Sequence, residues 1–128
     1  MGDDTPEDTF RYIVRELDKL QLAYLRLVEP AMVGSASDEK YDPRWNSIIQ
    51  QLRAEFHGVL MLAGGYDRNH AEKALQSGRA DIIAFGRPFI ANPDLPERFE
   101  GDWALNPADV ATFFGGGAGG YIDYPALA

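Results

Sequence analysis

The chain has 128 residues, a formal net charge of −8 at pH 7 and no cysteine. This charge argues against a nucleic acid or an anionic membrane surface as a general partner, and the lack of cysteine excludes disulfides, thiolate metal ligands and thiol nucleophiles. No apolar run approaches the roughly 18 residues of a membrane span, and the acidic N-terminus is unlike a signal peptide, so we expect a cytoplasmic protein of one domain.

The first predicted unit is a helix followed by a strand. Thr5 suits the N-cap of the helix, and Pro6 suits its first position. A strand is expected over residues 22–28, where an apolar run stops at Glu29-Pro30. The helix is predicted because apolar residues recur at helical spacing, namely Phe10, Ile13, Val14, Leu17 and Leu20.

The second predicted unit follows a polar loop and repeats the order of helix and strand. Asp42-Pro43 is again a cap followed by proline, and the helix is expected to run to about Phe56. The strand covers residues 59–63 and ends abruptly in Gly64-Gly65.

The third predicted unit has the same order. Asp67 is expected to cap a helix that runs to about Ser77, and Gly78 is a natural stop for it. A strand over residues 82–85 then ends in Gly86-Arg87.

A last short helix is predicted near the C-terminus, from Asn106-Pro107 to about Phe114. The tail after it is rich in glycine and then in aromatic residues, so it is not expected to form regular structure. Residues 115–120 lack the Gly-Lys-Ser/Thr ending of a P-loop, which argues against nucleoside triphosphate binding.

The alternation of helices with short apolar strands predicts an α/β fold in which parallel strands are joined by right-handed crossovers. Three such strands do not close on themselves, and helices on one side would leave the other face of the sheet open. The chain is therefore interpreted as one segment, residues 1–128, of a barrel or of a wider sheet, with no internal domain boundary.

Glycines follow two of the predicted strands, at the ends where ligands bind in parallel α/β folds. Gly64-Gly65 and Gly86 would let backbone N–H groups approach an anion, and Arg87 would add a bidentate partner for phosphate. The helix that starts at Asp67 would add its positive end. The alternative is that the glycines only form tight turns and Arg87 is a surface charge, and the residues alone leave both interpretations open.

Other polar and aromatic residues favour structural roles. His57 and His70 lie near helix ends without a second ligand at metal spacing, so a structural or solvated role is favoured over catalysis. Phe113-Phe114 either packs the last helix or borders a planar ligand. Helix capping explains the acidic residues near the N-terminus better than a metal site does, and these residues are Asp3, Asp4, Glu7 and Asp8.

Four stretches of sequence are informative together, and they cover nearly the whole chain from about Thr5 onward: LAYLRLVEP, VLMLAGGYDRNHAEKAL, ADIIAFGRPFIANPDLPERF and LNPADVATFFGGGAGGYIDYP. In this order they resemble the C-terminal part of the old yellow enzyme family, the FMN-dependent ene-reductases. The combination of FGRPFIANPDLPERF with GGYIDYP is highly specific for that family.

The resemblance implies a partial (β/α)8 TIM barrel, in which this chain supplies the last three strand units and the helix before them. It implies FMN bound at the carboxyl ends of the strands, with the phosphate on Gly64, Gly65, Gly86 and Arg87. Phe113-Phe114 matches an aromatic pair that flanks the flavin and the substrate space. Many relatives have tyrosine at the second position, so the hydroxyl is missing here.

The resemblance also implies what the chain lacks. The earlier barrel strands of the family carry the groups that bind the flavin ring, the pair that holds the substrate carbonyl, and the tyrosine proton donor. We therefore expect no catalytic residue and no metal site in this chain. Hydride transfer from NAD(P)H through FMN to an activated alkene would need the missing segments.

The opening MGDDTPEDTF is similar to internal family sequence, so we expect a fragment: a natural truncation, half of a split enzyme, or a deliberate piece. Its expected partner is a complementary N-terminal barrel segment or further copies of itself. Three functions remain open. The chain is a segment that is active only with the missing units, a self-associating module that binds phosphate or FMN, or a folded remnant with neither activity.

Overall fold

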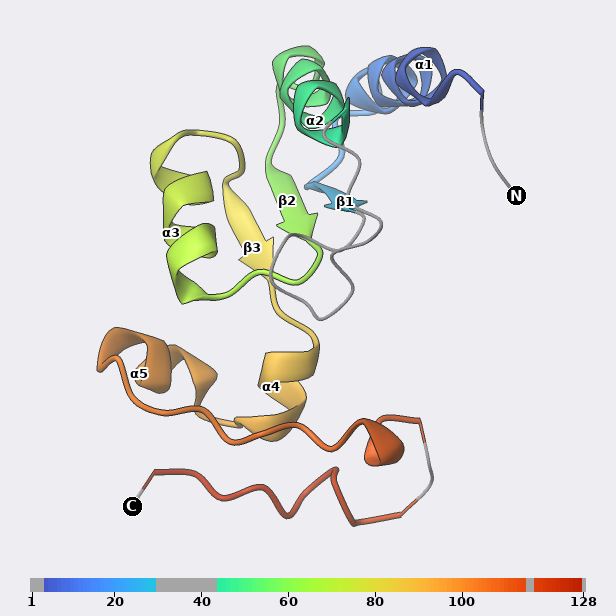
Figure 1. The fold of residues 1–128 in the computed structure, drawn as a ribbon. Helices are drawn as coiled ribbons and strands as arrows, with labels where there is room; N and C mark the ends of the chain where they lie inside the picture. The colour runs from blue at the N-terminus through green and yellow to red at the C-terminus, as the bar shows by residue number, and fades with distance from the viewer. Residues whose placement is uncertain (1–3, 30–43, 115–116, 128) are drawn as a thin grey trace. The chain divides into compact units, whose positions relative to one another are not determined.

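The computed structural model describes residues 4–29, 44–114 and 117–127 (Figure 1). The chain forms two compact units, Met1–Ala84 and Phe85–Ala128. The predicted cap at Asp42-Pro43 lies outside the described residues. None of the helices in the described part is long and apolar enough to cross a membrane.

The described residues of the first unit alternate between helices and parallel strands (Figure 1). The strands lie side by side in the order β1 (Leu25–Val28), β2 (Leu60–Ala63) and β3 (Ile82–Ala84). Each strand follows a helix, and these helices are α1 (Pro6–Asp18), α2 (Arg44–Glu55) and α3 (Arg68–Gln76). The predicted alternation of helices with parallel strands is therefore confirmed within this unit.

The strand register gives the sheet two faces of different burial. On one face Leu60 and Leu62 are fully buried, and Leu62 lies in a row with Leu27 and Ile83. On the other face the side chains are much more accessible, since Val28 is 67% exposed and Ile82 41% exposed. The prediction that one face of a three-stranded sheet stays open is therefore confirmed.

The core of the first unit is apolar. Phe10 of α1 meets Trp45 of α2 edge to face, with ring centroids 5.8 Å apart. Arg11 and Arg15 of α1 both pair with Glu55 at the end of α2. The helical spacing identifies the inward face of α2, whereas in α1 only Val14 of the predicted stripe is buried and Ile13 is exposed. The buried apolar residues from α1 to β2 are Val14, Ile48, Ile49, Leu52, Phe56, Leu60 and Leu62.

The two predicted helix caps that the structure describes have different outcomes. Asp67 caps α3 as expected, because its side chain accepts a hydrogen bond from His70 N at 2.8 Å. Thr5 occupies the N-cap position and Pro6 begins α1, as predicted, but the Thr5 side chain makes no capping hydrogen bond. Thr5 has φ −129° and ψ 57°, outside the extended conformation usual for a cap, and its carbonyl oxygen accepts from Thr9 N at 3.1 Å.

The second unit begins with two short helices that the sequence analysis does not predict. These helices are α4 (Arg87–Ala91) and α5 (Leu95–Glu100), and each has a proline in its first turn. They are 5 and 6 residues long. Helices of one to two turns are too short for an apolar period to be visible in the sequence.

The predicted helix over residues 106–114 is wrong. The structure has only a single 3₁₀ turn there, η2 (Val110–Thr112). Its cap is Asp109, whose side chain accepts from Ala111 N at 3.0 Å, so the helical conformation begins later than the Asn-Pro pair suggests. The glycine-rich segment that follows gives a longer helix no support.

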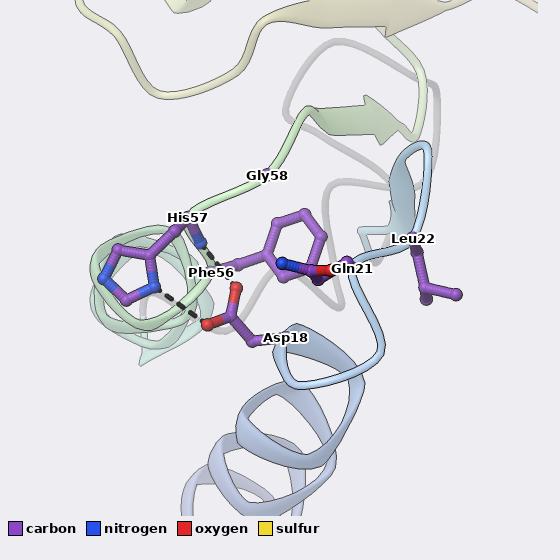
Figure 2. Close-up of a pocket in the computed structure, with 6 residues that line it drawn as sticks. All are labelled: Asp18, Gln21, Leu22, Phe56, His57 and Gly58. Atoms are coloured by element: carbon purple, nitrogen blue, oxygen red, sulfur yellow. Dashed lines mark hydrogen bonds and ion pairs between the residues drawn. The ribbon is translucent and has the colours of Figure 1, made fainter.

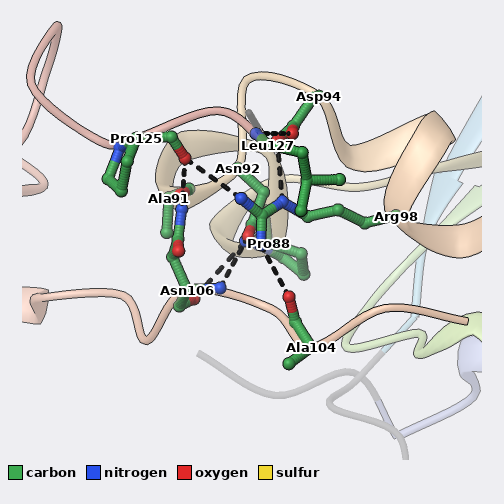
Figure 3. A network of polar contacts seen from close by, with 9 residues as sticks. All are labelled: Pro88, Ala91, Asn92, Asp94, Arg98, Ala104, Asn106, Pro125 and Leu127. Carbon is green, nitrogen blue, oxygen red and sulfur yellow. Dashed lines mark hydrogen bonds and ion pairs between the residues drawn. The ribbon is translucent and has the colours of Figure 1, made fainter.

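A network of polar contacts holds the C-terminal tail to α5 (Figure 3). Arg98 is only 5% exposed, and it donates to Ala104 O at 2.6 Å and to Pro125 O at 3.1 Å. Its Nε donates to Asp94 Oδ1 at 2.7 Å, and Asp94 Oδ2 accepts from Leu127 N at 2.6 Å. The tail is therefore irregular, as expected, and is bound through its main chain.

Two asparagines extend this network to α4 (Figure 3). The fully buried Asn92 donates to Pro88 O at 2.8 Å and accepts from Asn106 N at 2.7 Å. Asn106 in turn donates to Ala91 O at 2.9 Å and to Pro125 O at 2.8 Å. The two stretches that are most specific for the family resemblance therefore bind each other.

Candidate functional site

A glycine turn follows β2 at the carboxyl end of the sheet. Gly64 and Gly65 have φ angles of 143° and 74°, which glycine adopts far more readily than other residues. A Cβ on Gly64 would lie 2.7 Å from Glu29 O, so this position needs glycine for space as well as for conformation. Gly65 is exposed, which leaves its backbone accessible to an anion.

The second predicted pair begins α4 in the second unit. Gly86 has a φ of −96°, and no atom lies within 4 Å of a Cβ built there, so this fold does not itself require glycine at that position. Arg87 is exposed, and no described carboxylate pairs with it. By contrast, Arg53, Arg79 and Arg98 all have acidic partners. Arg26 is also exposed without a described acidic partner, so the exposure of Arg87 fits a surface charge as well as a phosphate ligand, and both interpretations stay open.

Both pairs follow strands whose carboxyl ends are neighbours. Ala63 pairs with Ala84 in parallel register, so β2 and β3 end side by side. Gly64 follows Ala63 directly, and Gly86 comes shortly after Ala84. This edge is where ligands bind in folds of this class. Gly64-Gly65 belongs to the first unit, and Gly86-Arg87 belongs to the second.

The aromatic pair of the tail lies in the second unit. The rings of Phe113 and Phe114 meet edge to face, with centroids 6.4 Å apart and an interplanar angle of 86°. Phe113 is half-buried, whereas Phe114 is fully exposed. The exposure of Phe114 shows that it does not pack in the interior of this unit, and its place beside a planar ligand stays a prediction.

Beside the glycine turn lies a buried carboxylate, that of Glu29, for which the sequence predicts no role. Glu29 follows β1, is only 6% exposed, and accepts hydrogen bonds from the Tyr66 hydroxyl and from Arg79 Nη2. Burial and the hydrogen bond to Glu29 raise the pKa of Tyr66, which keeps its hydroxyl protonated as a donor. Burial lowers the pKa of Arg79, but the hydrogen bond to Glu29 outweighs burial and raises it.

No local signal in the sequence reveals this network, because the partners of Glu29 lie 37 and 50 residues along the chain. Glu29-Pro30 indicates only the end of a strand. A buried charge with two partners requires long-range structure to be recognised.

The start of α3 offers less to an anion than the sequence predicts. The Asp67 carboxylate itself binds His70, with 2.8 Å to the backbone nitrogen and 2.8 Å to the ring Nδ1. Burial raises the pKa of Asp67, but the bonds from His70 outweigh burial and lower it, so the carboxylate stays charged. The N-terminus of α3 therefore already holds a negative charge, and its assistance to phosphate binding stays a prediction.

A hollow of about 440 Å³ lies near the amino ends of β1 and β2, away from the glycine turn (Figure 2). Within it, Asp18 accepts from His57 N at 2.8 Å and lies 2.9 Å from His57 Nδ1. The His57 side chain is 80% exposed and makes a polar contact only with Asp18 among the described residues, which is compatible with the structural or solvated role expected of it. The hollow contains none of the predicted site residues, and it is lined by Asp18, Gln21, Leu22, Phe56, His57 and Gly58.

Metal chemistry has no support in the described part of the chain, where no group of three or more His, Cys, Asp or Glu side chains could hold a metal ion. The acidic residues of the first turn of α1, Glu7 and Asp8, lie where they favour the positive end of that helix.

Comparison with known families matches residues 9–106 to the NADH:flavin oxidoreductase / NADH oxidase family. The chain belongs to this family. Its members bind FMN and use NAD(P)H as the reductant. The resemblance to the old yellow enzymes that was noted on sequence motifs is therefore confirmed.

Two curated plant relatives illustrate the match in sequence. The chain is 41% identical over 127 residues to the putative 12-oxophytodienoate reductase 3 of Oryza sativa subsp. japonica, and 37% identical over 129 residues to 12-oxophytodienoate reductase 2 of Arabidopsis thaliana. Each alignment covers 98% of this chain but only 32% and 33% of the two relatives. The chain thus spans about a third of the length of these relatives.

Two solved structures of flavin enzymes illustrate the match in fold. Morphinone reductase is 46% identical with a TM-score of 0.85, over 98% of this chain and 32% of that chain. The old yellow enzyme of Trypanosoma cruzi is 33% identical with a TM-score of 0.83, over 98% of this chain and 31% of that one. These neighbours are TIM barrels, so the expected fold class, part of a (β/α)8 barrel with three parallel strands, is confirmed.

The donor types at the predicted positions fit the phosphate end of FMN. Glycine backbone N–H groups and a guanidinium without an acidic partner among the described residues are the groups that recognise phosphate in proteins. Open space at Gly86 allows a ligand to approach the main chain closely.

Proposed function

We propose that this chain is the FMN-phosphate-binding segment of an NAD(P)H-dependent flavin oxidoreductase that reduces activated alkenes. The observation that carries the proposal is Arg87, an exposed guanidinium that no described carboxylate neutralises. It follows Gly86 after a strand whose carboxyl end adjoins that of β2. When FMN is bound, it supplies the hydride chemistry, and the protein supplies binding and orientation.

Each proposed site residue has a distinct role. Gly64 and Gly65 present backbone N–H groups to the phosphate, and Gly86 leaves room for it. Arg87 neutralises the phosphate charge through paired N–H bonds. Phe113-Phe114 borders the flavin.

We further propose that the chain alone is inactive and acts with a complementary N-terminal barrel segment. The test mixes it with the N-terminal segment of a relative and FMN, and follows NADPH-dependent reduction of an enone. Recovered activity supports the proposal. No activity from two folded segments would contradict it.

FMN titration tests the phosphate site directly. Arg87→Ala should weaken FMN binding about 10- to 150-fold, because a charge-assisted contact to phosphate contributes about 1.5–3 kcal/mol. The matched control is Lys73→Ala, which removes an equal charge from the exposed surface of α3 and should leave the affinity unchanged. Equal affinities for wild type and Arg87→Ala would rule out the role given to Arg87.

A second candidate is a non-catalytic module that self-associates and retains affinity for FMN or phosphate. The exposed Val28 and Ile82 on the open sheet face favour it, because apolar surface of this kind tends to be covered by a partner. Size-exclusion chromatography with light scattering and a flavin spectrum separates the possibilities. An associated yellow species favours the module, an associated colourless species favours a remnant, and a monomer at high concentration contradicts self-association.

A further inference from the structure

We propose that Glu29 is a positioning residue for the proposed phosphate turn. It holds Gly64-Gly65 in the conformation that presents their N–H groups, while Tyr66 and Arg79 fix its carboxylate. The inference rests on the proposed function, because it concerns the same site, and it adds residues that the sequence motifs do not identify.

Glu29 contacts the glycine turn on both sides. Before the turn, Glu29 N donates to Ala63 O at 2.7 Å. After the turn, the Tyr66 hydroxyl donates to Glu29 Oε2. Between them, Glu29 O is the atom nearest to a Cβ built on Gly64, at 2.7 Å. Glu29 thus binds the residue before the glycine turn, Ala63, and the residue after it, Tyr66.

The Glu29 carboxylate, which accepts from Tyr66, is itself held firmly. Arg79 Nη2 donates to its second oxygen, Oε1, and the Glu29 side chain is only 4% exposed. Arg79 comes from the segment after α3, where its own N–H donates to Ala74 O at 3.0 Å. Buried ion pairs add little net stability, but this pair fixes the orientation of the carboxylate, which is what a positioning role needs.

The glycine turn requires such support. Both glycines have positive φ angles, and glycine has the largest conformational freedom to lose on folding. A turn that samples other conformations binds an anion more weakly, in proportion to the fraction of time it spends in the competent one. Holding the turn from Glu29 therefore raises the affinity without a contact to the ligand.

The network does this without repelling the anion. Glu29 carries a negative charge, and the Arg79 guanidinium neutralises it at direct contact. Tyr66 is 4% exposed, so its hydroxyl faces Glu29 rather than solvent. Neither Glu29 nor Tyr66 is assigned a contact with the phosphate, and both act through the turn.

Tyr66→Phe in the full chain is the main test, because it removes one hydroxyl and keeps the ring. Amide signals and hydrogen exchange of Gly64 and Gly65 are measured without ligand, and dissociation constants are measured for FMN and for inorganic phosphate. Loss of one buried hydrogen bond should speed exchange and weaken binding by about 2- to 10-fold each. The matched control is Tyr124→Phe, which removes a hydroxyl that accepts from Asp109 N in the second unit and should change neither quantity.

The two measurements separate the possible failures. If wild type binds neither probe, the proposed function is wrong, and glycine exchange still decides whether Glu29 holds the turn. Unchanged exchange in a folded Tyr66→Phe variant overturns the positioning role, and so does faster exchange with unchanged affinity. Should Tyr66→Phe fail to fold, Arg79→Lys carries the same measurements, because it keeps the charge and loses the planar donor.

Discussion

The guanidinium of Arg98 donates to the main-chain oxygen of Pro125 at 3.1 Å across 27 residues of sequence. The same side chain binds Ala104 O and Asp94, and it is almost completely buried. A tail without a described helix or strand is thus held by side chains that bind its backbone. Polar contacts to the main chain therefore hold the tail of the second unit.

Arg98→Ala is expected to release the tail. It leaves the carbonyl groups of Ala104 and Pro125 without this donor, and buried hydrogen bonds from a charged donor contribute about 1.5–3 kcal/mol each, so unfolding should become easier by more than about 2 kcal/mol. Urea denaturation measures the loss. Chymotrypsin with mass spectrometry should show faster cleavage after Tyr121.

The matched control for this prediction is Arg15→Ala. Arg15 also pairs with a carboxylate, but its side chain is 55% exposed, and exposed pairs contribute little. Cleavage of the tail in this variant should match wild type. Equal cleavage in Arg98→Ala would show that the tail is held by other contacts.

Alanine should destabilise the fold at Gly64 but not at Gly86. Gly64→Ala places a Cβ 2.7 Å from Glu29 O at a φ of 143°, so we expect a loss of at least about 2 kcal/mol in the free energy of unfolding. Gly86→Ala meets nothing within 4 Å at an ordinary φ, so its stability should stay within about 0.5 kcal/mol of wild type. Thermal unfolding of both variants checks this, and equal losses would contradict it.

The contribution of the Asp18–His57 contact to the free energy of unfolding should be lost at acid pH. The hydrogen bond from His57 N, followed by that from its ring, holds the pKa of Asp18 below its usual value. A depressed carboxyl pKa contributes stability above the unfolded pKa of about 3.9, and this is lost as the pH falls through the folded pKa. Asp18→Asn should therefore lose less stability than wild type on acidification below about pH 4.

His57→Gln separates the two parts of that effect. The backbone hydrogen bond is the larger cause, and it survives a change of side chain. The acid dependence of unfolding, measured by urea denaturation between neutral pH and pH 3, should therefore stay closer to wild type in His57→Gln than in Asp18→Asn. The reverse order would assign the effect to the imidazole.

Val28→Glu should reduce self-association. Val28 is 67% exposed on the open sheet face, and a charge there opposes covering that face with a second copy. Tyr12→Glu is the control, since Tyr12 is 66% exposed on α1. Light scattering should show smaller species for Val28→Glu alone. Equal sizes for both variants would place the contact elsewhere.

Local sequence patterns predict most of the first unit. Apolar spacing in α1 and α2 and the cap at Asp67 depend on neighbours within a few residues, so they are visible in one sequence. The short α4 and α5 are not, because their ends depend on contacts such as Asn92 with Asn106. The motif residues Gly64, Gly65, Gly86 and Arg87 could be predicted as a candidate site because glycine and arginine at strand ends have a direct chemical meaning.

The support around that candidate site is not visible in the sequence. Glu29 resembles any residue that ends a strand until Tyr66 and Arg79 are seen against it. The same holds for Asp67, whose own carboxylate occupies the helix end that was expected to receive an anion. In both cases, long-range geometry decides which charges are already satisfied.

The three-stranded sheet also limits what self-association can achieve. Within the described residues, β1 and β3 each have a neighbour on one side only, so strands of another segment can extend the sheet at either edge. A barrel of this class closes at eight strands with a fixed stagger, and eight is not a multiple of three. Two copies of this chain joined edge to edge give six strands, and three copies give nine. Only a segment that brings the five remaining strands reproduces the closed barrel, so its addition is expected to dissolve the oligomer.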